Sequence, residues 1–247
     1  MDRMIYLAMS GAKQTMMAQT INAQNLANIS TTGFRADLAA FRSLPVNGPG
    51  YPSRVYAIAE DEGVDFGKGR LMTTGNELDM AVRGNGWIVV QGTDGREGLT
   101  RAGNMKITET GNLVTGTNEN QVMGDGGPIV IPPSEKVEIG EDGTVTVLPV
   151  GQSASTLAVV GRIKLVNPPS QELEKGPDGL MRLQSGDTAV SDVKVRLVSG
   201  TLESSNVNAM DAMINMITLQ RAFEANIKMM SAAKDNDEAT ATMMRIN

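Results

Sequence analysis

The side chains that most often carry catalysis and metal binding are missing from this chain. Its 247 residues contain no His and no Cys, which excludes a Ser-His-Asp triad, a Cys-His pair, a disulfide and the usual zinc sites. Carboxylates remain for acid–base chemistry, and they gather at residues 60–62 and 235–238. We interpret Glu60, Asp61 and Glu62 as a charged, solvated turn, because no pocket-forming residues flank them.

The second acidic group and two short glycine loops are the other candidates for ligand contact. Asp235, Asp237 and Glu238 resemble part of a calcium loop, but no glycine stands at the sharp turn, so we interpret them as a solvated helix face. Gly67-Lys68-Gly69 and Gly84-Asn85-Gly86 are fragments of phosphate-binding loops without the full spacing or a following helix. We expect tight turns at both places.

An enzyme that uses carboxylates alone is the last catalytic alternative. A glycosidase of this kind needs two acids beside a deep cleft, commonly with aromatic platforms for the sugar, and the chain has one Trp and three Tyr. We therefore predict that the protein is not an enzyme, with no catalytic residue, no metal site and no cofactor.

Charge and hydropathy exclude further classes. The net charge is −6 and the basic residues are scattered, so we expect no nucleic-acid partner and no anionic membrane surface. No segment approaches the roughly 20 apolar residues that span a bilayer, so we expect no direct membrane insertion. The first residues, with Asp2, Tyr6 and Lys13, lack the pattern of a secretory signal peptide.

The distribution of helix breakers indicates the elements that carry these residues. Residues 12–32 and 201–247 hold no Gly or Pro, all 10 prolines lie between Pro45 and Pro177, and 11 glycines lie between Gly84 and Gly127. Because both residue types are unfavourable inside helices and common in turns, this predicts an α+β fold. Helices at both ends, of the coiled-coil type, flank a central all-β domain.

We expect four parts along the chain. They are an N-terminal helix at 1–33, an extended arm at 34–70, a β-rich domain at 71–200 and a C-terminal helix at 201–247. The first helix should run from Asp2 to about Ile29 and stop at Gly33, which can take a positive φ. Ser205 or Asn206 is the expected cap of the last helix.

Within these parts, a short helical or irregular piece is expected through Phe34 and Phe41, and Leu44 to Pro52 should be extended. Short strands are expected at 78–82, 87–91, 105–108, 129–131, 137–139, 144–148, 157–166, 180–183 and 193–199. Asp94-Gly95, Thr110-Gly111-Asn112 and Glu141-Asp142-Gly143 are the expected hairpin turns between them.

Each terminal helix also carries a heptad of mainly apolar residues, and these candidate subunit-interface residues predict coiled-coil packing. The N-terminal seam consists of Ile5, Met9, Ala12, Met16, Gln19, Ala23 and Leu26. The C-terminal seam consists of Ala209, Met213, Met216, Gln220, Phe223, Ile227 and Met230.

The seams have two interpretations. The simpler one pairs the two helices within one chain, and we expect contacts from neighbouring subunits in addition. Gln19 and Gln220 either bond a neighbouring helix and fix its register, or turn outward if the seam is displaced by one position.

Several motifs resemble those of bacterial flagellar rod and hook proteins. They are Asn25-Leu26-Ala27-Asn28-Ile29-Ser30-Thr31-Thr32-Gly33-Phe34, Thr74-Gly75-Asn76-Glu77-Leu78-Asp79, Gly84-Asn85-Gly86-Trp87, Leu99-Thr100-Arg101-Ala102-Gly103-Asn104, Gly200-Thr201-Leu202-Glu203-Ser204-Ser205-Asn206-Val207 and Gln220-Arg221-Ala222-Phe223-Glu224. They follow the family's order over almost the whole chain. The length and residues 160–166 are most similar to proximal-rod members. Longer distal-rod members have Tyr at the position of Phe223 and Ser at that of Ile227.

The resemblance implies a structural subunit of the periplasmic rod, the axial driveshaft that transmits torque from motor to hook and encloses an export channel. It implies partners: copies of the same chain, other rod proteins of the proximal and distal rod, and the flagellar type III export apparatus, which exports subunits without a cleaved signal peptide. Family members place both terminal helices in the inner tube wall and the β domain outside. The alternatives are a distal-rod or hook-family axial subunit and, in another class, an oligomeric ligand-binding β module, which would form a discrete dimer instead of a polymer.

Overall fold

The computed structural model describes residues 3–45, 55–149, 151 and 157–245. The chain forms two compact units. The helical unit comprises residues 1–28, 37–65 and 207–247, and the β unit comprises residues 29–36 and 66–206. The predicted fold class, α+β with terminal helices and a central all-β part, is confirmed.

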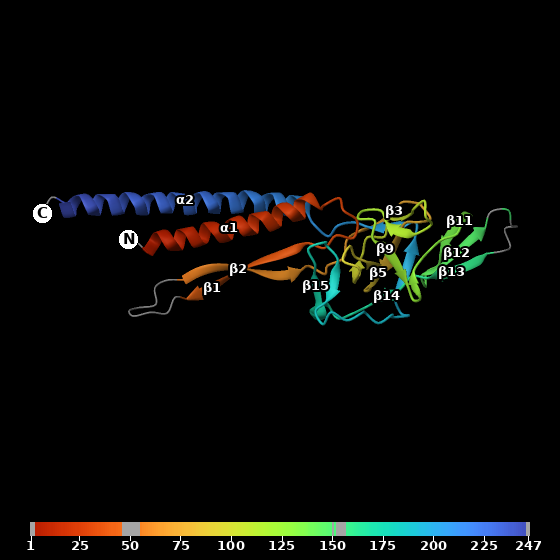
Figure 1. Cartoon of the computed structure of the whole chain (residues 1–247). Helices are drawn as coiled ribbons and strands as arrows, with labels where there is room; N and C mark the ends of the chain where they lie inside the picture. Colours follow the sequence, from red (N-terminus) through yellow and green to blue (C-terminus); the bar gives the residue numbers. More distant parts are fainter. Residues whose placement is uncertain (1–2, 46–54, 150, 152–156, 246–247) are drawn as a thin grey trace. The chain divides into compact units, whose positions relative to one another are not determined.

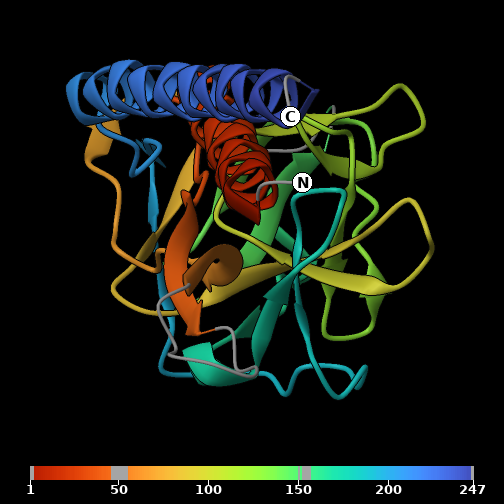
Figure 2. The same cartoon turned by 90° about the vertical axis from the view of Figure 1, so that its left-hand side faces the viewer.

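The helical unit consists of two long helices and a β-hairpin. Helix α1 (Arg3–Ala27) runs antiparallel to α2 (Ala209–Arg245) and lies between it and the hairpin of β1 (Asp37–Pro45) and β2 (Val55–Val64) (Figures 1 and 2). Apart from Gly11, neither helix contains a Gly or Pro, so each continues for many turns. Asp2, expected to begin the first helix, lies outside the described residues.

The side of α2 that faces α1 has a regular spacing. Its less exposed residues recur at alternating steps of three and four, which is the spacing of a coiled-coil interface. They are Ala209, Ala212, Met216, Leu219, Phe223, Asn226, Met230, Ala233 and Asp237. The pattern continues from the first turn of α2 almost to its end, so one side of the helix is used for packing within the chain.

The helix ends differ from the predictions. Helix α1 ends at Ala27, and Gly33, at φ 67°, lies in the loop that follows it. The cap of α2 is Asn208, whose Oδ1 accepts a hydrogen bond from the Met210 N–H at 3.0 Å. The predicted caps, Ser205 and Asn206, were wrong, because both belong to the β unit and lie before the helix.

The predicted arm at 34–70 contains a two-stranded ribbon. Residues 34–36 are irregular, as expected, but Phe41 lies in β1 and Glu60 to Glu62 lie in β2, so the expectations of an irregular piece at Phe41 and of an acidic turn were wrong. Strand pairing uses backbone groups, and Ala39 pairs with Asp61 and Ala40 with Glu60 in an antiparallel register. Residues 46–52 of the predicted extended piece lie outside the described residues.

The β unit is built from short antiparallel strands. Its largest sheet has the order β15-β16-β6-β5-β9-β8-β7, with β10 beside β9 and β14 beside β5. These strands are β5 (Trp87–Gln91), β6 (Glu97–Thr100), β7 (Met105–Ile107), β8 (Leu113–Thr115), β9 (Gln121–Gly124), β10 (Gly127–Pro128), β14 (Leu165–Val166), β15 (Leu173–Lys175) and β16 (Met181–Leu183).

Three smaller sheets and a 3-10 helix complete the unit. A three-stranded sheet joins β11 (Ser134–Ile139), β12 (Thr144–Pro149) and β13 (Ala158–Arg162). Two further pairs are β17 (Arg196–Ser199) with β4 (Met80–Arg83) and β18 (Thr201–Glu203) with β3 (Leu71–Thr73). The 3-10 helix, η1 (Ser170–Glu172), precedes β15. In these pairs, strands from the end of the unit's sequence lie beside strands from its beginning.

Aliphatic side chains from several sheets form one core, which contains Ile88, Val90, Leu113, Val122, Val145, Ile163, Leu165 and Leu197. The three predicted hairpin turns are confirmed, each with its glycine at a positive φ. Strand β5 has the predicted bounds, whereas residues 129–131 lie after β10 and form an isolated bridge at Val130. Strands β6, β8 and β9 were not predicted, because glycine and polar residues interrupt their short apolar runs.

Candidate functional site: a buried ion cluster and a helix seam

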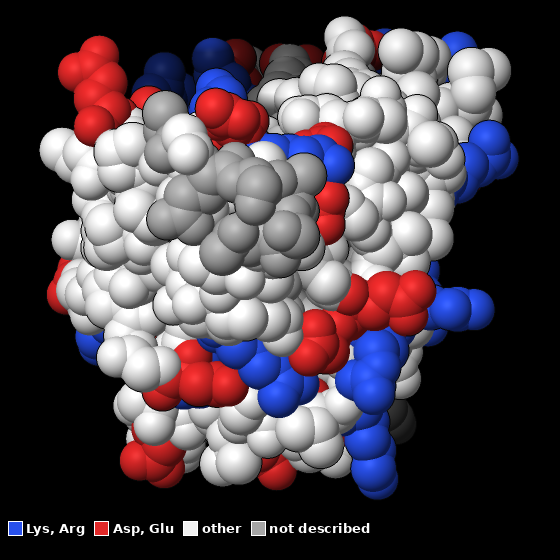
Figure 3. Space-filling model, turned by 90° about the vertical axis from the view of Figure 1, so that its right-hand side faces the viewer, with Lys and Arg blue, Asp and Glu red and all other residues white. Residues whose placement is uncertain are grey.

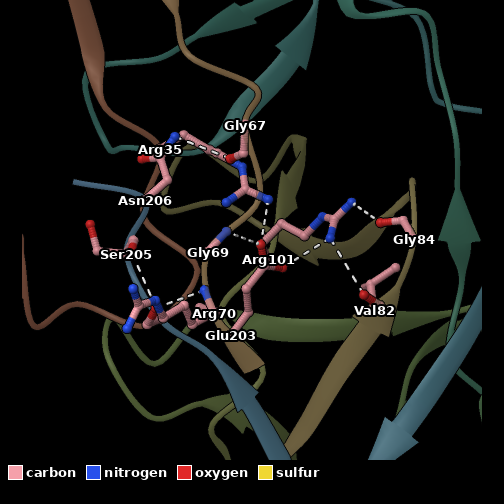
Figure 4. Close-up of polar contacts among 12 residues, drawn as sticks. Arg35, Gly67, Gly69, Arg70, Val82, Gly84, Arg101, Glu203, Ser205 and Asn206 are labelled. Atoms are coloured by element: carbon pink, nitrogen blue, oxygen red, sulfur yellow. Dashed lines mark hydrogen bonds and ion pairs between the residues drawn. The ribbon is translucent and has the colours of Figure 1, made fainter. Parts of the chain in front are cut away.

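Glu203 lies at the centre of a buried ion cluster in the β unit (Figure 4). Its Oε1 accepts hydrogen bonds from Arg35 Nη2 at 2.7 Å and from the Gly69 N–H at 2.9 Å. Its Oε2 accepts one from Arg101 Nη1 at 2.9 Å. The side chains of Glu203, Arg35 and Arg101 are 1%, 3% and 4% exposed, so the three charges are almost completely removed from water.

Trp87 provides one wall of this cluster. Its ring centroid lies 5.9 Å from the Arg35 guanidinium and 5.5 Å from that of Arg101, both within the range of cation–π attraction. The Phe66 ring meets Trp87 edge-on at a centroid distance of 6.3 Å. The single Trp of the chain therefore stabilises both buried guanidiniums through cation–π attraction in a place that water does not reach.

The cluster has two guanidiniums for one carboxylate, and backbone carbonyls serve as additional acceptors. Arg101 donates to the Gly84 carbonyl at 2.8 Å and to the Val82 carbonyl at 3.5 Å. Burial lowers the pKa of Arg101 below its ordinary value, while the charge and hydrogen bond of Glu203 oppose that shift. Removing one partner of such a buried pair costs about 3–5 kcal/mol, so the arrangement is sensitive to the loss of Glu203.

Glu203 also marks the place where two distant segments meet within the β unit. The Gly33 N–H donates to the Glu203 carbonyl at 2.8 Å, and the Asn206 N–H donates to the Phe34 carbonyl at 3.3 Å. Asn206 Oδ1 in turn accepts the Ala36 N–H at 2.8 Å. Residues 29–36 are thereby fastened to the segment that contains β18.

Two glycines permit the close contacts of these segments. Gly33 has a φ of 67°, and a Cβ there would lie 2.2 Å from the Arg101 carbonyl carbon. A Cβ at Gly103 would lie 1.5 Å from the Met80 carbonyl oxygen, whereas the actual Gly103 carbonyl accepts the Met80 N–H at 2.9 Å. Any larger residue would force the backbones apart.

Residues 74–79 join the same region through Asp79. Its Oδ2 accepts the Thr74 hydroxyl at 2.7 Å, and its carbonyl accepts the Gly200 N–H at 2.7 Å. The Thr74 N–H donates to the Gly200 carbonyl at 2.8 Å. Most of the motifs found in the sequence therefore converge in the β unit, and what they build is a set of structural joints.

The helical unit contains the two predicted seams, and each of them has both packed and exposed residues in the single chain. In the N-terminal seam, Ala12 is buried, Ile5, Gln19 and Leu26 are half-buried, and Met9, Met16 and Ala23 are exposed. In the C-terminal seam, Ala209, Met216, Phe223 and Met230 face α1, whereas Met213, Gln220 and Ile227 are exposed. Gln220 is exposed in the single chain and Gln19 is half-buried, and both interpretations of these residues stay predictions.

Small residues set the packing of α1 against α2. Buried positions on α1 are Ala8, Ala12, Thr15 and Ala18. A Cβ at Gly11 would lie 2.9 Å from Asn226 Oδ1, and Asn22 Nδ2 donates to the Ala212 carbonyl across the helices at 2.7 Å. The predicted N-terminal seam contains only Ala12 of these four buried positions, because the heptad search followed large apolar residues such as Met9.

The acidic candidate at residues 235–238 lies on α2. Lys234 forms an exposed ion pair with Glu238 at 3.6 Å on α2, which fits a solvated helix face. Among the described residues, no group of three acids is placed to hold a metal ion, and no helix is long and apolar enough to cross a membrane.

Comparisons with known proteins identify relatives along the whole chain. The family model described as flagellar basal body rod FlgEFG protein C-terminal matches residues 198–243, and the flagellar hook protein FlgE/F/G D1 domain matches residues 81–147. These segments contain Glu203, and Trp87 with Arg101. The chain is 41% identical over 243 residues to the flagellar basal-body rod protein FlgF of Salmonella typhimurium strain LT2 and 42% identical over 242 residues to that of Escherichia coli K12, each alignment covering 96% of both chains. It is 29% identical over 255 residues to the flagellar basal-body rod protein FlgG of Bacillus subtilis strain 168, covering 95% of this chain and 96% of that protein.

Proposed function

The chain belongs to the family of flagellar basal-body rod proteins, and on this premise we propose how it takes its place in the rod. It is a structural subunit of the proximal rod and not an enzyme. The observation that carries this conclusion is the identity of 41–42% to rod proteins along 96% of the chain. The structure is consistent with a structural role, because the family motifs of the sequence form hydrogen-bonded backbone joints and a buried ion cluster.

We propose that the terminal helices assemble with neighbouring subunits through the sides that α1–α2 packing leaves free. Large apolar side chains there are 40% exposed or more: Met4, Tyr6, Met9, Met16 and Met17 on α1, and Met210, Met213, Ile214, Ile217, Ile227 and Met229 on α2. Exposed apolar surface of this extent is typical of protein–protein interfaces. Both interpretations of the seams are then used, since one side of α2 packs within the chain and the other contacts neighbours.

The partners in this proposal are copies of the same chain and other rod proteins. The paired helices would line the inner wall of the tube around the export channel, with the β unit outside. Torque would then pass between subunits through packed helices, whose low compressibility suits the transmission of force. The type III export apparatus is the proposed route by which the subunit reaches the periplasmic rod.

An outward-facing substitution tests the assembly surface. Ile217 is 53% exposed on the free side of α2, so Ile217→Lys leaves the folded chain almost unchanged while placing an ammonium in the proposed interface. We expect the variant to have the wild-type melting temperature but to fail to restore swimming to a strain that lacks the gene. Lys234→Ala, at another exposed position of α2, is the control and should restore it. Normal swimming with Ile217→Lys would contradict this surface.

A further inference from the structure

The β unit has a basic groove of about 400 Å³ between its two glycine loops. Its charged and amide side chains are Lys68, Arg83, Lys194, Asp192, Asn85 and Asn167. Lys68 comes from the loop at residues 67–69 and Asn85 from the loop at 84–86, so the two loops that the sequence marked as fragments of phosphate-binding loops line one surface.

Both loops are held rigidly from behind by the buried ion cluster and its neighbours. The Gly84 carbonyl accepts Arg101 Nη2, the Gly67 carbonyl accepts Asn206 Nδ2 at 3.1 Å, and the Gly69 N–H donates to Glu203 (Figure 4). The groove is therefore a preformed surface, and a ligand would not have to order the loops on binding.

The groove carries an excess of positive charge. Three cations face one carboxylate, and Asp192 Oδ1 accepts the Lys194 backbone N–H at 2.9 Å. Within the part of the chain that the structure describes, none of Lys68, Arg83 and Lys194 forms an ion pair. This is unusual in a protein whose net charge is −6.

The register of β4 and β17 adds to this excess. Arg83 lies directly opposite Arg196 in the antiparallel pair, and like charges in that position are destabilising. Arg196 donates to the carbonyls of Val193 and Val195, which are neutral acceptors and leave its own charge uncompensated. An anion supplied from outside the chain would relieve this repulsion.

A larger charged hollow of the β unit is already compensated. The larger hollow of about 620 Å³ contains Arg182, but Asp178 binds that guanidinium at 2.6 Å and Asp94 contacts it at 3.3 Å. On the face shown in Figure 3, basic side chains likewise lie beside acidic ones. The basic groove differs from that hollow, because no carboxylate of the described residues forms an ion pair with its three cations.

We propose that the basic groove binds carboxylate groups of an acidic peptide segment. Resting on the proposed function, this segment belongs to a neighbouring axial subunit. A copy of this chain has a net charge of −6 and carries exposed acids at β-unit turns, such as Glu109, Glu119 and Glu141, which supplies the complementary charge. A nucleic acid fits poorly, because the groove is short and the acidic remainder of the chain repels a long polyanion.

The test measures binding of a short poly-glutamate peptide to the isolated full-length chain by calorimetry at low salt. The triple variant Lys68→Gln/Arg83→Gln/Lys194→Gln should bind it about tenfold more weakly, since each exposed ion pair contributes a fraction of 1 kcal/mol. Lys106→Gln/Arg221→Gln/Lys228→Gln is the matched control, with the same change in net charge at exposed cations away from the groove, and should bind as the wild type does.

Two results would overturn the groove assignment. One is equal weakening in the triple variant and the control, which would show that only overall charge matters. The other is saturation by inorganic phosphate without any binding of the peptide, which would show a small-anion site. Circular dichroism confirms that each variant is folded. Because this binding is measured on the isolated chain, its failure is distinguishable from a failure of the Ile217→Lys test in cells.

Discussion

The side-chain amide of Asn25 pairs with both backbone groups of Asp37. Its Oδ1 accepts the Asp37 N–H at 2.9 Å, and its Nδ2 donates to the Asp37 carbonyl at 2.8 Å. One residue near the end of α1 thereby substitutes for a strand partner at the start of β1. Within the helical unit, these two hydrogen bonds set where the hairpin begins beside the helix.

Asn25→Ala should therefore destabilise the helical unit. The change removes two partly buried hydrogen bonds to the Asp37 backbone, which costs about 1–3 kcal/mol. Urea unfolding followed by far-UV circular dichroism measures the loss. Gln24→Ala is the matched control, because Gln24 is an exposed amide one residue earlier. Equal stability of the two variants would contradict a structural role for the Asn25–Asp37 pair.

Glu203→Gln should strongly destabilise the β unit. The substitution removes the one carboxylate that lies between the buried Arg35 and Arg101, at an expected cost of about 3–5 kcal/mol. Trp87 lies against both guanidiniums, and its fluorescence reports unfolding at this place because it is the chain's one Trp. Glu109→Gln, at an exposed turn, should leave the unfolding midpoint unchanged. A wild-type midpoint for Glu203→Gln would show that the cluster contributes little stability.

The pair of Asp178 and Arg182 predicts a pH dependence on the acid side. Hydrogen bonds from Arg182 hold the pKa of Asp178 below its ordinary value of 3.8. A lowered folded pKa contributes stability above the unfolded value, and this contribution is lost as the pH falls through the folded pKa. Asp178→Asn should thus be less stable than the wild type near neutral pH, and the difference should disappear in acid.

Urea midpoints measured from neutral pH down to below the ordinary Asp pKa give this comparison. Asp187→Asn, at an exposed position, should follow the wild-type curve throughout. A constant gap between Asp178→Asn and the wild type at every pH would mean that the ion pair is not the source of the difference.

The export proposal gives a separate prediction in cells. If the subunit leaves by the type III export apparatus, a strain with an inactive apparatus should retain the protein in the cytoplasm. Cell fractionation followed by immunoblotting measures its distribution, with a signal-peptide-dependent periplasmic protein as the control. Normal amounts in the periplasm of that strain would require a different route.

The sequence predicted the element types better than their contacts. The Gly and Pro distribution gave helices at both ends and strands between, because local backbone preference decides these. Within the chain, α2 packs through Ala212, Leu219 and Asn226, whereas the predicted interface residues Met213, Gln220 and Ile227 are exposed, and their contact with neighbouring subunits stays a prediction. Large apolar residues dominate a heptad search, whereas close helix packing here is made by small ones.

The ion cluster lay beyond sequence reasoning for another reason. Arg35 and Glu203 are 168 positions apart, and no periodicity links them. Arg35 follows one family motif and Glu203 lies within another, so the resemblance marked both regions. It did not indicate that the two side chains pair with each other. The ribbon of β1 and β2 was missed because acidic residues at 60–62 favour a turn by composition alone, whereas backbone pairing determines the ribbon.

Locating the subunit in isolated basal bodies tests the central claim most directly. The chain has no Cys, and Val190 is 86% exposed in the β unit, so Val190→Cys provides one accessible thiol for a biotin–maleimide label. Basal bodies purified from a motile Val190→Cys strain, decorated with gold-conjugated streptavidin and imaged by electron microscopy, should carry gold on the rod. Complete rods without gold, from cells in which the labelled protein is found elsewhere, would contradict the assignment of this chain to the rod.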